Sequence, residues 1–405
     1  MSRPLRGGLV VGQSGGPTAV INASLVGVVH AALASRAVGR VIGARFGVEG
    51  ILSGDLVDLG REAPETLETL RRTPAAALGS NRYKLAADDP ERILAALEAL
   101  DVRYFVYIGG NDSADTAHRV ALAAAERGYP LRAIHVPKTV DNDLPLTDHC
   151  PGYGSMARFV ALALRDTGRD TEAMRRVDPV KLVELPGRNA GWVIAASALA
   201  RRSEEDAPHL LFPPERRLSL DAFLDAIQRA YDRRGFVVAA VAETIRDEIG
   251  NPLGNAAGEL GMLDAFGHPR LVGAAERLCR EISGSLGLKA RWEKPGALAR
   301  SSITCVSETD LAEAYLVGRR AVEAALAGET DRMVSLVRES SNPYRATTGL
   351  VPLGEVANAE RLLPAEYLAA DGGDVTPAFR EYAEPLLGGP LPEYGRLSGL
   401  GLDRG

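Results

Sequence analysis

Three short polar segments of the sequence combine glycines, carboxylates, hydroxyls and a lysine more densely than ordinary surface loops do. Residues 137–143 read Pro-Lys-Thr-Val-Asp-Asn-Asp, residues 108–113 read Ile-Gly-Gly-Asn-Asp-Ser, and residues 13–18 read Gln-Ser-Gly-Gly-Pro-Thr. Glycines let backbone N–H groups approach phosphate oxygens, and carboxylates hold divalent metals. The three segments therefore indicate one site for a phosphorylated ligand and its metal.

Each polar segment follows a short apolar run that is typical of a buried strand. The runs are Gly8–Val11, Arg103–Tyr107 and Ala133–Val136, and helical patterns separate them. Ligands of open parallel sheets bind outside the carboxyl ends of the strands. The sequence thus predicts that the three segments meet at one edge of a parallel sheet.

The segment at residues 137–143 has the side chains that phosphoryl transfer needs, namely a base that orients the acceptor and a cation that takes up charge. Asp141 and Asp143 are candidates for the base and its electrostatic partner, beside Lys138 and Thr139. A turn followed by a helix cap also favours aspartates. It does not account for the adjacent lysine and threonine, so we interpret this segment as functional.

The other two segments are open to two interpretations. Gly15 and Gly16 suit a phosphate cradle before a helix N-terminus, and equally an ordinary tight turn. Asn111 and Asp112 suit metal ligands, and equally the N-cap of the following helix. Capping and metal binding are compatible at a strand end, and we expect both there.

The order of strand-like and helical segments predicts an α/β protein with two Rossmann-like, doubly wound domains. The first comprises residues 1–152 and about 300–345, and the second comprises residues 153–299. Residues 346–405 are richer in proline and glycine and have weaker periodicity. We expect them to form a C-terminal extension packed on both domains.

The composition excludes several classes of protein. The chain has 405 residues, 46% of them hydrophobic and 25% charged, which is typical of a globular protein. A net charge of -6 argues against nucleic-acid binding. No run is long enough for a membrane span and no secretory leader is evident. The three cysteines, Cys150, Cys279 and Cys305, lack metal-site spacing, and we expect reduced thiols in a cytoplasmic protein.

Taken together, the motifs resemble those of the phosphofructokinases. Residues 109–113 match Gly-Gly-x-x-Ser, residues 137–143 match Pro-x-Thr-x-Asp-Asn-Asp, and residues 183–192 read Val-Glu-Leu-Pro-Gly-Arg-Asn-Ala-Gly-Trp. The match runs in order from Gly12 to about Val322. It implies the two-domain phosphofructokinase fold, with a donor-binding first domain, a sugar-phosphate-binding second domain, Mg²⁺ as cofactor and fructose 6-phosphate as acceptor at its 1-hydroxyl.

The resemblance assigns roles to individual positions. It implies that Asp141 is the catalytic base, that Thr139 and Asp143 contact substrate from the same loop, and that Arg82 contacts the donor. On the acceptor side it implies contacts from Pro186, Gly187, Glu243 and Arg300. It also implies that Arg188 holds the transition state, and that Arg291 binds the sugar phosphate, often across a subunit interface. Guanidinium groups suit a phosphate dianion because they bind it through two parallel hydrogen bonds.

Two positions indicate the phosphoryl donor. The ATP-dependent phosphofructokinases have glycine where this chain has Asp112 and again where it has Lys138. A carboxylate at the first position obstructs the α-phosphate of ATP, and a lysine at the second supplies charge to a compact pyrophosphate. The resemblance is therefore to the pyrophosphate-dependent branch, with Asp112 and Lys138 in the catalytic machinery.

Some positions depart from the family pattern. Asn111 stands where most members carry an aspartate on the magnesium, and Ala297 and Ala299 stand where larger polar residues are common before Arg300. Asparagine still offers a neutral oxygen ligand, so we expect Asn111 and Asp112 to hold the metal together.

Two alternative functions remain open from the sequence, an ATP-dependent or donor-promiscuous phosphofructokinase and a non-catalytic regulatory subunit of the same fold. A dinucleotide-dependent dehydrogenase is disfavoured because no Gly-x-Gly-x-x-Gly motif opens the first helix. We expect pyrophosphate and fructose 6-phosphate as ligands, a homodimer or homotetramer, and neither nucleic acid nor membrane as a partner.

Overall fold

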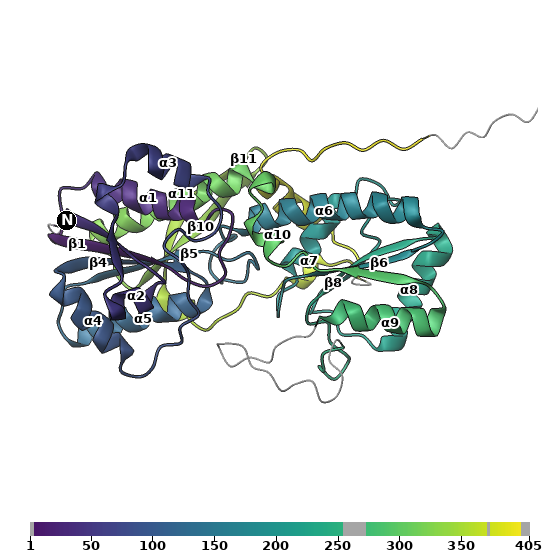
Figure 1. Ribbon diagram of the computed structural model, residues 1–405, viewed down its shortest axis with the longest axis horizontal. Helices are drawn as coiled ribbons and strands as arrows, with labels where there is room; N and C mark the ends of the chain where they lie inside the picture. The colour runs from purple at the N-terminus through teal and green to yellow at the C-terminus, as the bar shows by residue number, and fades with distance from the viewer. Residues whose placement is uncertain (1–3, 254–272, 371–372, 398–405) are drawn as a thin grey trace, which may run out of the picture.

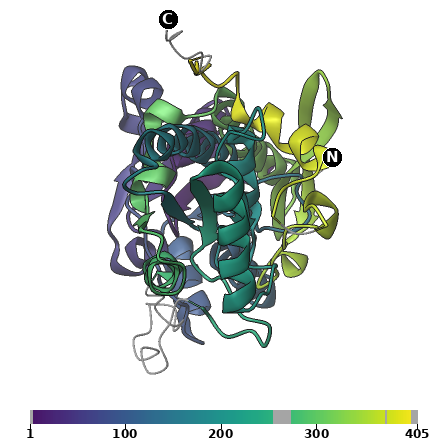
Figure 2. The ribbon, with the colours of Figure 1, turned by 90° about the vertical axis from the view of Figure 1, so that its right-hand side faces the viewer.

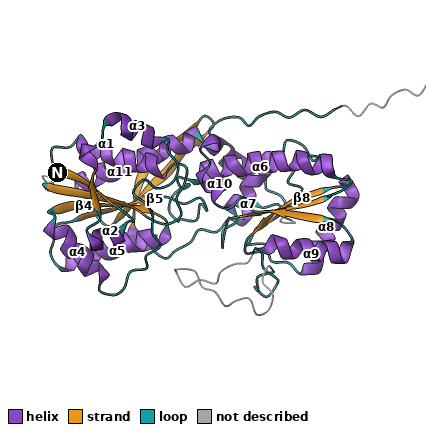
Figure 3. Ribbon diagram, in the orientation of Figure 1, coloured by secondary structure: helices purple, strands orange, loops and turns teal. Residues whose placement is uncertain are grey.

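The protein folds into two α/β domains that lie side by side (Figure 1). The computed structural model describes residues 4–253, 273–370 and 373–397. Each domain has a central sheet between two layers of helices (Figure 3). This confirms the predicted fold class. Within the described residues, no helix is long and apolar enough to cross a membrane.

The first domain is built on a seven-stranded sheet with the order β11-β10-β5-β4-β1-β2-β3. Its strands are β1 (Gly7–Gln13), β2 (Val38–Ala44), β3 (Leu56–Asp58), β4 (Val102–Gly109), β5 (Arg132–Pro137), β10 (Arg332–Ser341) and β11 (Tyr344–Pro352). The central strands pair in parallel. They are apolar on both faces because helices cover both faces of the sheet.

Helices of the first domain form two layers. One face carries α1 (Ile21–Leu33), α3 (Pro64–Arg71) and α11 (Glu308–Ala327), and the other carries α2 (Val48–Ser53), α4 (Asp89–Ala99) and α5 (Asn111–Glu126) (Figure 1). The sequence sets the ends of α11 clearly. Ser307 caps its start by accepting from Asp310 N–H, and Gly328 ends it in the left-handed conformation.

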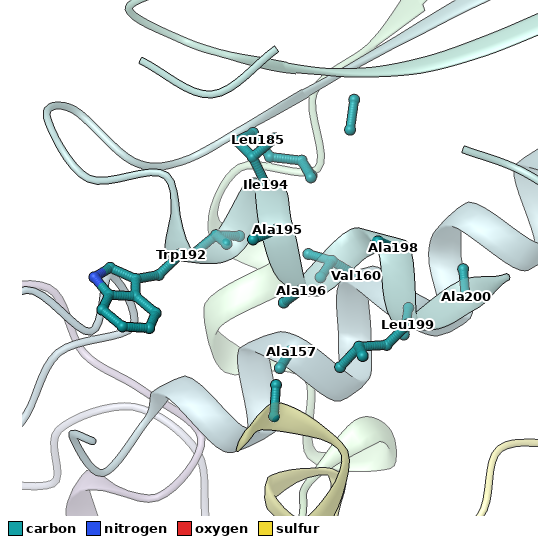
Figure 4. Close-up of a cluster of buried hydrophobic side chains, with 14 of the residues drawn as sticks. Ala157, Val160, Leu185, Trp192, Ile194, Ala195, Ala196, Ala198, Leu199 and Ala200 are labelled. Atoms are coloured by element: carbon teal, nitrogen blue, oxygen red, sulfur yellow. The ribbon is translucent and has the colours of Figure 1, made fainter. Parts of the chain in front are cut away.

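The second domain is built on a smaller parallel sheet with the order β7-β8-β6-β9. The strands are β6 (Val180–Leu185), β7 (Leu210–Phe212), β8 (Val237–Ala242) and β9 (Ala290–Glu293). Helices α6 (Tyr153–Met174) and α7 (Trp192–Ser197) cover one face, and α8 (Leu220–Arg234) and α9 (Ala274–Leu286) cover the other. Figure 4 shows the core on the first face, where small residues of α6 and α7 pack below Leu185, and Trp192 lies at one side of them.

The C-terminal part differs from the prediction at its start. Residues 344–352, most of which we expected in the extension, form β11 and pair antiparallel with β10 at the edge of the first sheet. Their periodicity is weak because an edge strand is only half-buried along most of its length. The described residues after β11, 353–370 and 373–397, run along one side of the molecule (Figure 2). They include α12 (Pro377–Ala383), and Leu353 and Phe379 pack into the cores of the first and second domains respectively.

A buried carboxylate joins the two domains. Asp310 of α11 is 1% exposed and accepts hydrogen bonds from Gly152 N (2.8 Å), Ser155 N (2.9 Å) and Ser155 Oγ (2.6 Å) at the start of α6. These N–H groups have no partner within their own helix, and the helix dipole favours a negative charge there. Asp310 thus caps the helix that carries the chain into the second domain.

Replacing this cap should destabilise the protein. Asp310→Ala leaves three buried donors unpaired, and we expect it to lower the free energy of unfolding by about 3 kcal/mol. Urea denaturation followed by circular dichroism measures the change. Glu308→Ala is the matched control, because Glu308 lies in the same helical turn and forms an exposed ion pair with Arg72, worth about 1 kcal/mol or less. Equal shifts in the two variants would contradict the role of Asp310.

Candidate active site

The three polar segments meet at the carboxyl ends of adjacent strands of the first sheet. β1 lies between β4 and β2, so the strand order reverses between β1 and β4, the place where open α/β sheets bind ligands. Hydrogen bonds join the segments to one another, from Ser14 N to Ile108 O and from Lys138 N to Gly109 O, each of 2.9 Å. The sequence prediction that these segments lie together is therefore confirmed.

The second sheet brings its own carboxyl ends to the same place. Pro186, Gly187 and Arg188 follow β6, and Glu243 follows β8, whose end pairs with the end of β6. Glu243 N donates to Leu185 O over 3.2 Å. Gly187 has a φ of 133°, and a Cβ atom there would lie 2.6 Å from Ala190 O, so the turn requires glycine.

A cavity of about 370 Å³ lies between the two sets of strand ends. Eight of the residues that the sequence predicted line this cavity, namely Gly16, Arg82, Lys138, Thr139, Asp141, Pro186, Glu243 and Arg300. The remaining lining residues are Val140, Met156, Glu184, Lys294, Gly296 and Ala297. The volume suits a sugar phosphate or a similar small ligand.

Lys138 places a buried cation at the floor of this cavity. It is 3% exposed, and its Nζ donates to Gly16 O over 2.9 Å. A Cβ atom at Gly15 would lie 3.1 Å from Lys138 Nζ, and one at Gly16 would lie 3.1 Å from Arg300 Nη1. Both glycines therefore face cations. Burial lowers the pKa of Lys138 to about 8, although Asp141 and Asp143 oppose the shift.

A simple structural role for Lys138 would be an ion pair with Asp141 or Asp143 of the same loop. Within the described residues, no ion pair joins Lys138 to either carboxylate. Its ammonium group instead approaches the glycine loop at the end of β1.

Asp141 presents an unpaired carboxylate oxygen. Within the described part of the chain, its Oδ1 is buried without a hydrogen-bond partner, and the residue lines the cavity. Its backbone N–H donates to Thr139 Oγ1 over 3.1 Å. Burial, together with the negative charges of Asp143 and Glu243, raises the pKa of Asp141 to about 7, although the charge of Lys138 opposes the shift. Burial also raises the pKa of Asp143. A carboxylate with these properties suits a general base near neutral pH.

A lysine and a glutamate that the sequence analysis missed complete the opposite wall. Lys294 Nζ donates to Glu184 Oε1 over 2.6 Å and lies 3.9 Å from Glu243 Oε2. Glu184 is 1% exposed and also accepts from Ala275 N at the start of α9. Burial raises the pKa of Glu243. A signal for Lys294 was present, because it is the first residue after β9 and therefore lies at a carboxyl end.

Seven predicted residues do not line the cavity. Four of them, Gly15, Asp143, Gly187 and Arg188, lie in the same loops as lining residues, and the other three have different surroundings. Arg291 is exposed on β9 opposite Lys181, far from the carboxyl end of β6, and pairs with Asp178 over 3.3 Å. Asn111 uses its amide to hold the C-terminal segment, accepting from Asn358 N over 2.7 Å and donating to Ala359 O. Asp112 is exposed in the first turn of α5, at the end of β4.

Comparison with known proteins agrees with this geometry. The model of the family described as Phosphofructokinase matches residues 8–325. A pyrophosphate–fructose 6-phosphate 1-phosphotransferase from Halomonas elongata is 41% identical over 93% of this chain and 91% of its own. A sulfofructose kinase from Alkalicoccus urumqiensis is 33% identical over 94% and 95% of the two chains. The crystal structure of a pyrophosphate-dependent phosphofructokinase from Nitrosospira multiformis superimposes with a TM-score of 0.86 at 37% identity, covering 97% of this chain and 94% of that one. These similarities confirm the resemblance that the motifs indicate, and the chain belongs to the phosphofructokinase family.

Proposed function

We propose that the protein is a pyrophosphate-dependent 6-phosphofructokinase. It transfers a phosphoryl group from pyrophosphate to the 1-hydroxyl of fructose 6-phosphate and releases fructose 1,6-bisphosphate and phosphate. The relatives and solved structures named for this activity support the assignment over nearly the whole chain. The observation that carries it is the buried ammonium of Lys138 against the Gly15-Gly16 loop, which suits a compact anionic donor.

On the donor side, the backbone N–H group of Gly16 and the cations Arg82 and Lys138 bind the pyrophosphate, while the N–H group of Gly15 holds the loop by donating to Asn81 O. Arg300, which the resemblance assigns to the acceptor, also lies beside Gly16 and so contacts both substrates. Lys138 stabilises the charge that develops on the leaving phosphate as the bridging P–O bond breaks. Its low accessibility strengthens this interaction, because the charges act in a medium of low dielectric constant.

On the acceptor side, the oxygen of the 1-hydroxyl attacks the transferred phosphorus and its proton passes to Asp141. The unpaired Oδ1 of Asp141 is the atom available to accept that proton. Glu243 accepts a hydrogen bond from a sugar hydroxyl, and the turn at Gly187 and Arg188 holds the sugar phosphate and the transferred group. Thr139 and Asp143 fix the loop and the substrate beside the base.

Phosphofructokinases in general use a divalent metal, and we propose Mg²⁺ here. Within the described residues, no three His, Cys, Asp or Glu side chains form a metal cluster. Such a cluster is unnecessary for Mg²⁺, which typically uses one or two carboxylates together with substrate phosphates. Asp112 fits this scheme through its exposed carboxylate, and Asn111 through its second lone pair. The metal would neutralise charge on the pyrophosphate.

We further propose a cytoplasmic homodimer or homotetramer. Arg291 lies away from the cavity of its own chain, so its predicted contact with the sugar phosphate requires a partner subunit. The three cysteines are free thiols, which is typical of the cytoplasm.

A coupled assay that compares pyrophosphate with ATP on fructose 6-phosphate tests the function. We expect turnover with pyrophosphate in both directions and little with ATP. Preference for ATP would favour the ATP-dependent alternative, and no transfer from either donor would favour a regulatory subunit. Sulfofructose in the same assay tests the acceptor, because a sulfofructose kinase is among the relatives.

The donor preference should depend on two residues. Asp112→Gly should raise kcat/KM for ATP from a near-zero value, because it removes the obstruction. Lys138→Gly should lower turnover with pyrophosphate, because it removes about 2.7–4 kcal/mol of transition-state stabilisation. Steady-state kinetics with both donors measures these effects, with circular dichroism as the folding control. ATP use that stays undetectable in a folded Asp112→Gly variant would show that another feature excludes ATP.

The pH profile of kcat/KM in the pyrophosphate direction should be a narrow bell. Asp141 must be ionised to accept a proton, so activity falls below its pKa of about 7. Lys138 must be protonated to stabilise charge, so activity also falls above its pKa of about 8. Asp141→Asn should remove the acidic limb of the profile and lower kcat/KM by a factor of about 10²–10⁴. Lys138→Arg should move the alkaline limb above pH 10, because guanidinium does not deprotonate there. An unchanged alkaline limb in this variant would assign that limb to another group.

Arg300 and Arg291 should differ in their dependence on assembly. Arg300→Ala should raise KM for both substrates, because the resemblance assigns Arg300 to the sugar phosphate and its guanidinium also lies beside Gly16 of the donor loop. Arg291→Ala should raise KM for fructose 6-phosphate alone, by about tenfold or more. Hybrids of Arg291→Ala and Asp141→Asn subunits should regain a site with the wild-type KM. Hybrids that show only the raised KM would place Arg291 outside the partner's site.

A further inference from the structure

The loop that carries Asp141 continues into a segment without regular secondary structure, residues 142–148. Asn142 and Leu146 there have positive φ angles of 57° and 60°. Buried carbonyl groups in such a segment need hydrogen-bond donors from elsewhere, because neither a helix nor a sheet supplies them. The conformation of this segment sets the position of Asp141, which directly precedes it, and of Asp143, which lies within it.

One residue of the C-terminal part supplies most of these donors. Arg361 Nη1 donates to Thr147 O (2.6 Å) and Asp148 O (2.7 Å), and Arg361 Nη2 donates to Asn142 O (2.9 Å). The backbone N–H of Arg361 donates to Asp143 O over 2.7 Å. A single residue therefore binds four carbonyl groups of the segment that follows the proposed base.

Arg361 is itself held by the second domain. Its guanidinium lies 4.5 Å from the ring centre of Trp192, and Trp192 Nε1 donates to Arg361 O over 3.1 Å. Trp192 is 2% exposed at the edge of the core shown in Figure 4. Two residues further on, Leu363 N donates to Glu215 Oε1, which also accepts from Gly191 N. Contacts with the second domain thus fix the position of Arg361.

Tyr382 reinforces the same segment from α12. Its hydroxyl donates to Asp148 O over 2.8 Å and accepts from Asn142 Nδ2 over 2.9 Å. Asn142 Oδ1 in turn accepts from Cys150 N. Two side chains from the C-terminal part therefore contact the back of the loop, whereas the cavity lies on its front.

We propose that Arg361 is a positioning residue for phosphoryl transfer, which sets the backbone of the loop that carries Asp141. The inference rests on the proposed function. Arg361 does not line the cavity, and its guanidinium contacts loop carbonyls and the Trp192 ring. It acts through the loop and not on the substrate. Misplacement of a catalytic group by about 1 Å can cost 10²-fold in rate. The glycine cradle belongs to a different loop, so pyrophosphate binding should be less affected.

The test compares Arg361→Ala and Arg361→Lys with Arg380→Ala. Arg380 of α12 is the matched control, because its guanidinium also binds a backbone carbonyl, Ala198 O over 3.0 Å, but in the second domain away from the loop. We expect Arg361→Ala to lower kcat by about 10²-fold with a KM for pyrophosphate within about threefold of wild type. Arg380→Ala should keep the wild-type kcat. Added guanidinium ion should restore part of kcat in Arg361→Ala and none in Asp141→Asn.

Three outcomes would overturn the proposal. They are a wild-type kcat in a folded Arg361→Ala variant, an equal loss of kcat in Arg380→Ala, and a loss that appears only in the KM for pyrophosphate. If Arg361→Ala does not fold, Arg361→Lys decides, because a single ammonium cannot reach all the carbonyls. A lowered kcat at an unchanged urea midpoint supports positioning, and an unchanged kcat refutes it. Assays with whichever donor the wild type uses keep this result separate from the donor assignment.

Discussion

The site depends on the contact between the buried ammonium group of Lys138 and the glycine loop at the end of β1. Lys138 is only 3% exposed, and burying a charge costs free energy unless neighbouring groups stabilise it. The carbonyl oxygen of Gly16 and the negative charges of Asp141 and Asp143 stabilise the ammonium group. The same burial raises the pKa of Asp141 to about 7. Opposite shifts in two neighbouring groups keep a cation and a weakly acidic carboxyl together near neutral pH. An anionic ligand would complete this balance of charges.

The two sheets create this environment because both direct their carboxyl ends at one cavity. The first sheet contributes the glycine loop and the lysine loop, and the second contributes Glu243 and the turn at Gly187. Contacts between lining residues hold these elements together. Lys138 Nζ donates to Gly16 O, and the Glu184–Lys294 pair links the ends of β6 and β9 across the wall.

The C-terminal part connects the two halves of this arrangement. Arg361 and Tyr382 bind the carbonyl groups of the segment after Asp141, and Trp192 of the second domain holds Arg361. A loop with positive φ angles and buried carbonyls cannot keep one conformation without such donors. The C-terminal part is therefore as important to the loop as the strand that precedes it.

The sequence by itself determined the fold class, the family and the loops of the site. Strands followed by glycine-rich or acidic segments have a strong local pattern, because buried parallel strands are continuously apolar and their ends are polar. The sequence did not identify β11, Lys294 or Arg361. An edge strand has weak periodicity, and the role of a lone lysine or arginine depends on where the chain places it. Only the tertiary structure decided that Arg291 lies outside its own cavity and that Arg361 lies behind the loop of Asp141, because both follow from contacts between residues far apart in the chain.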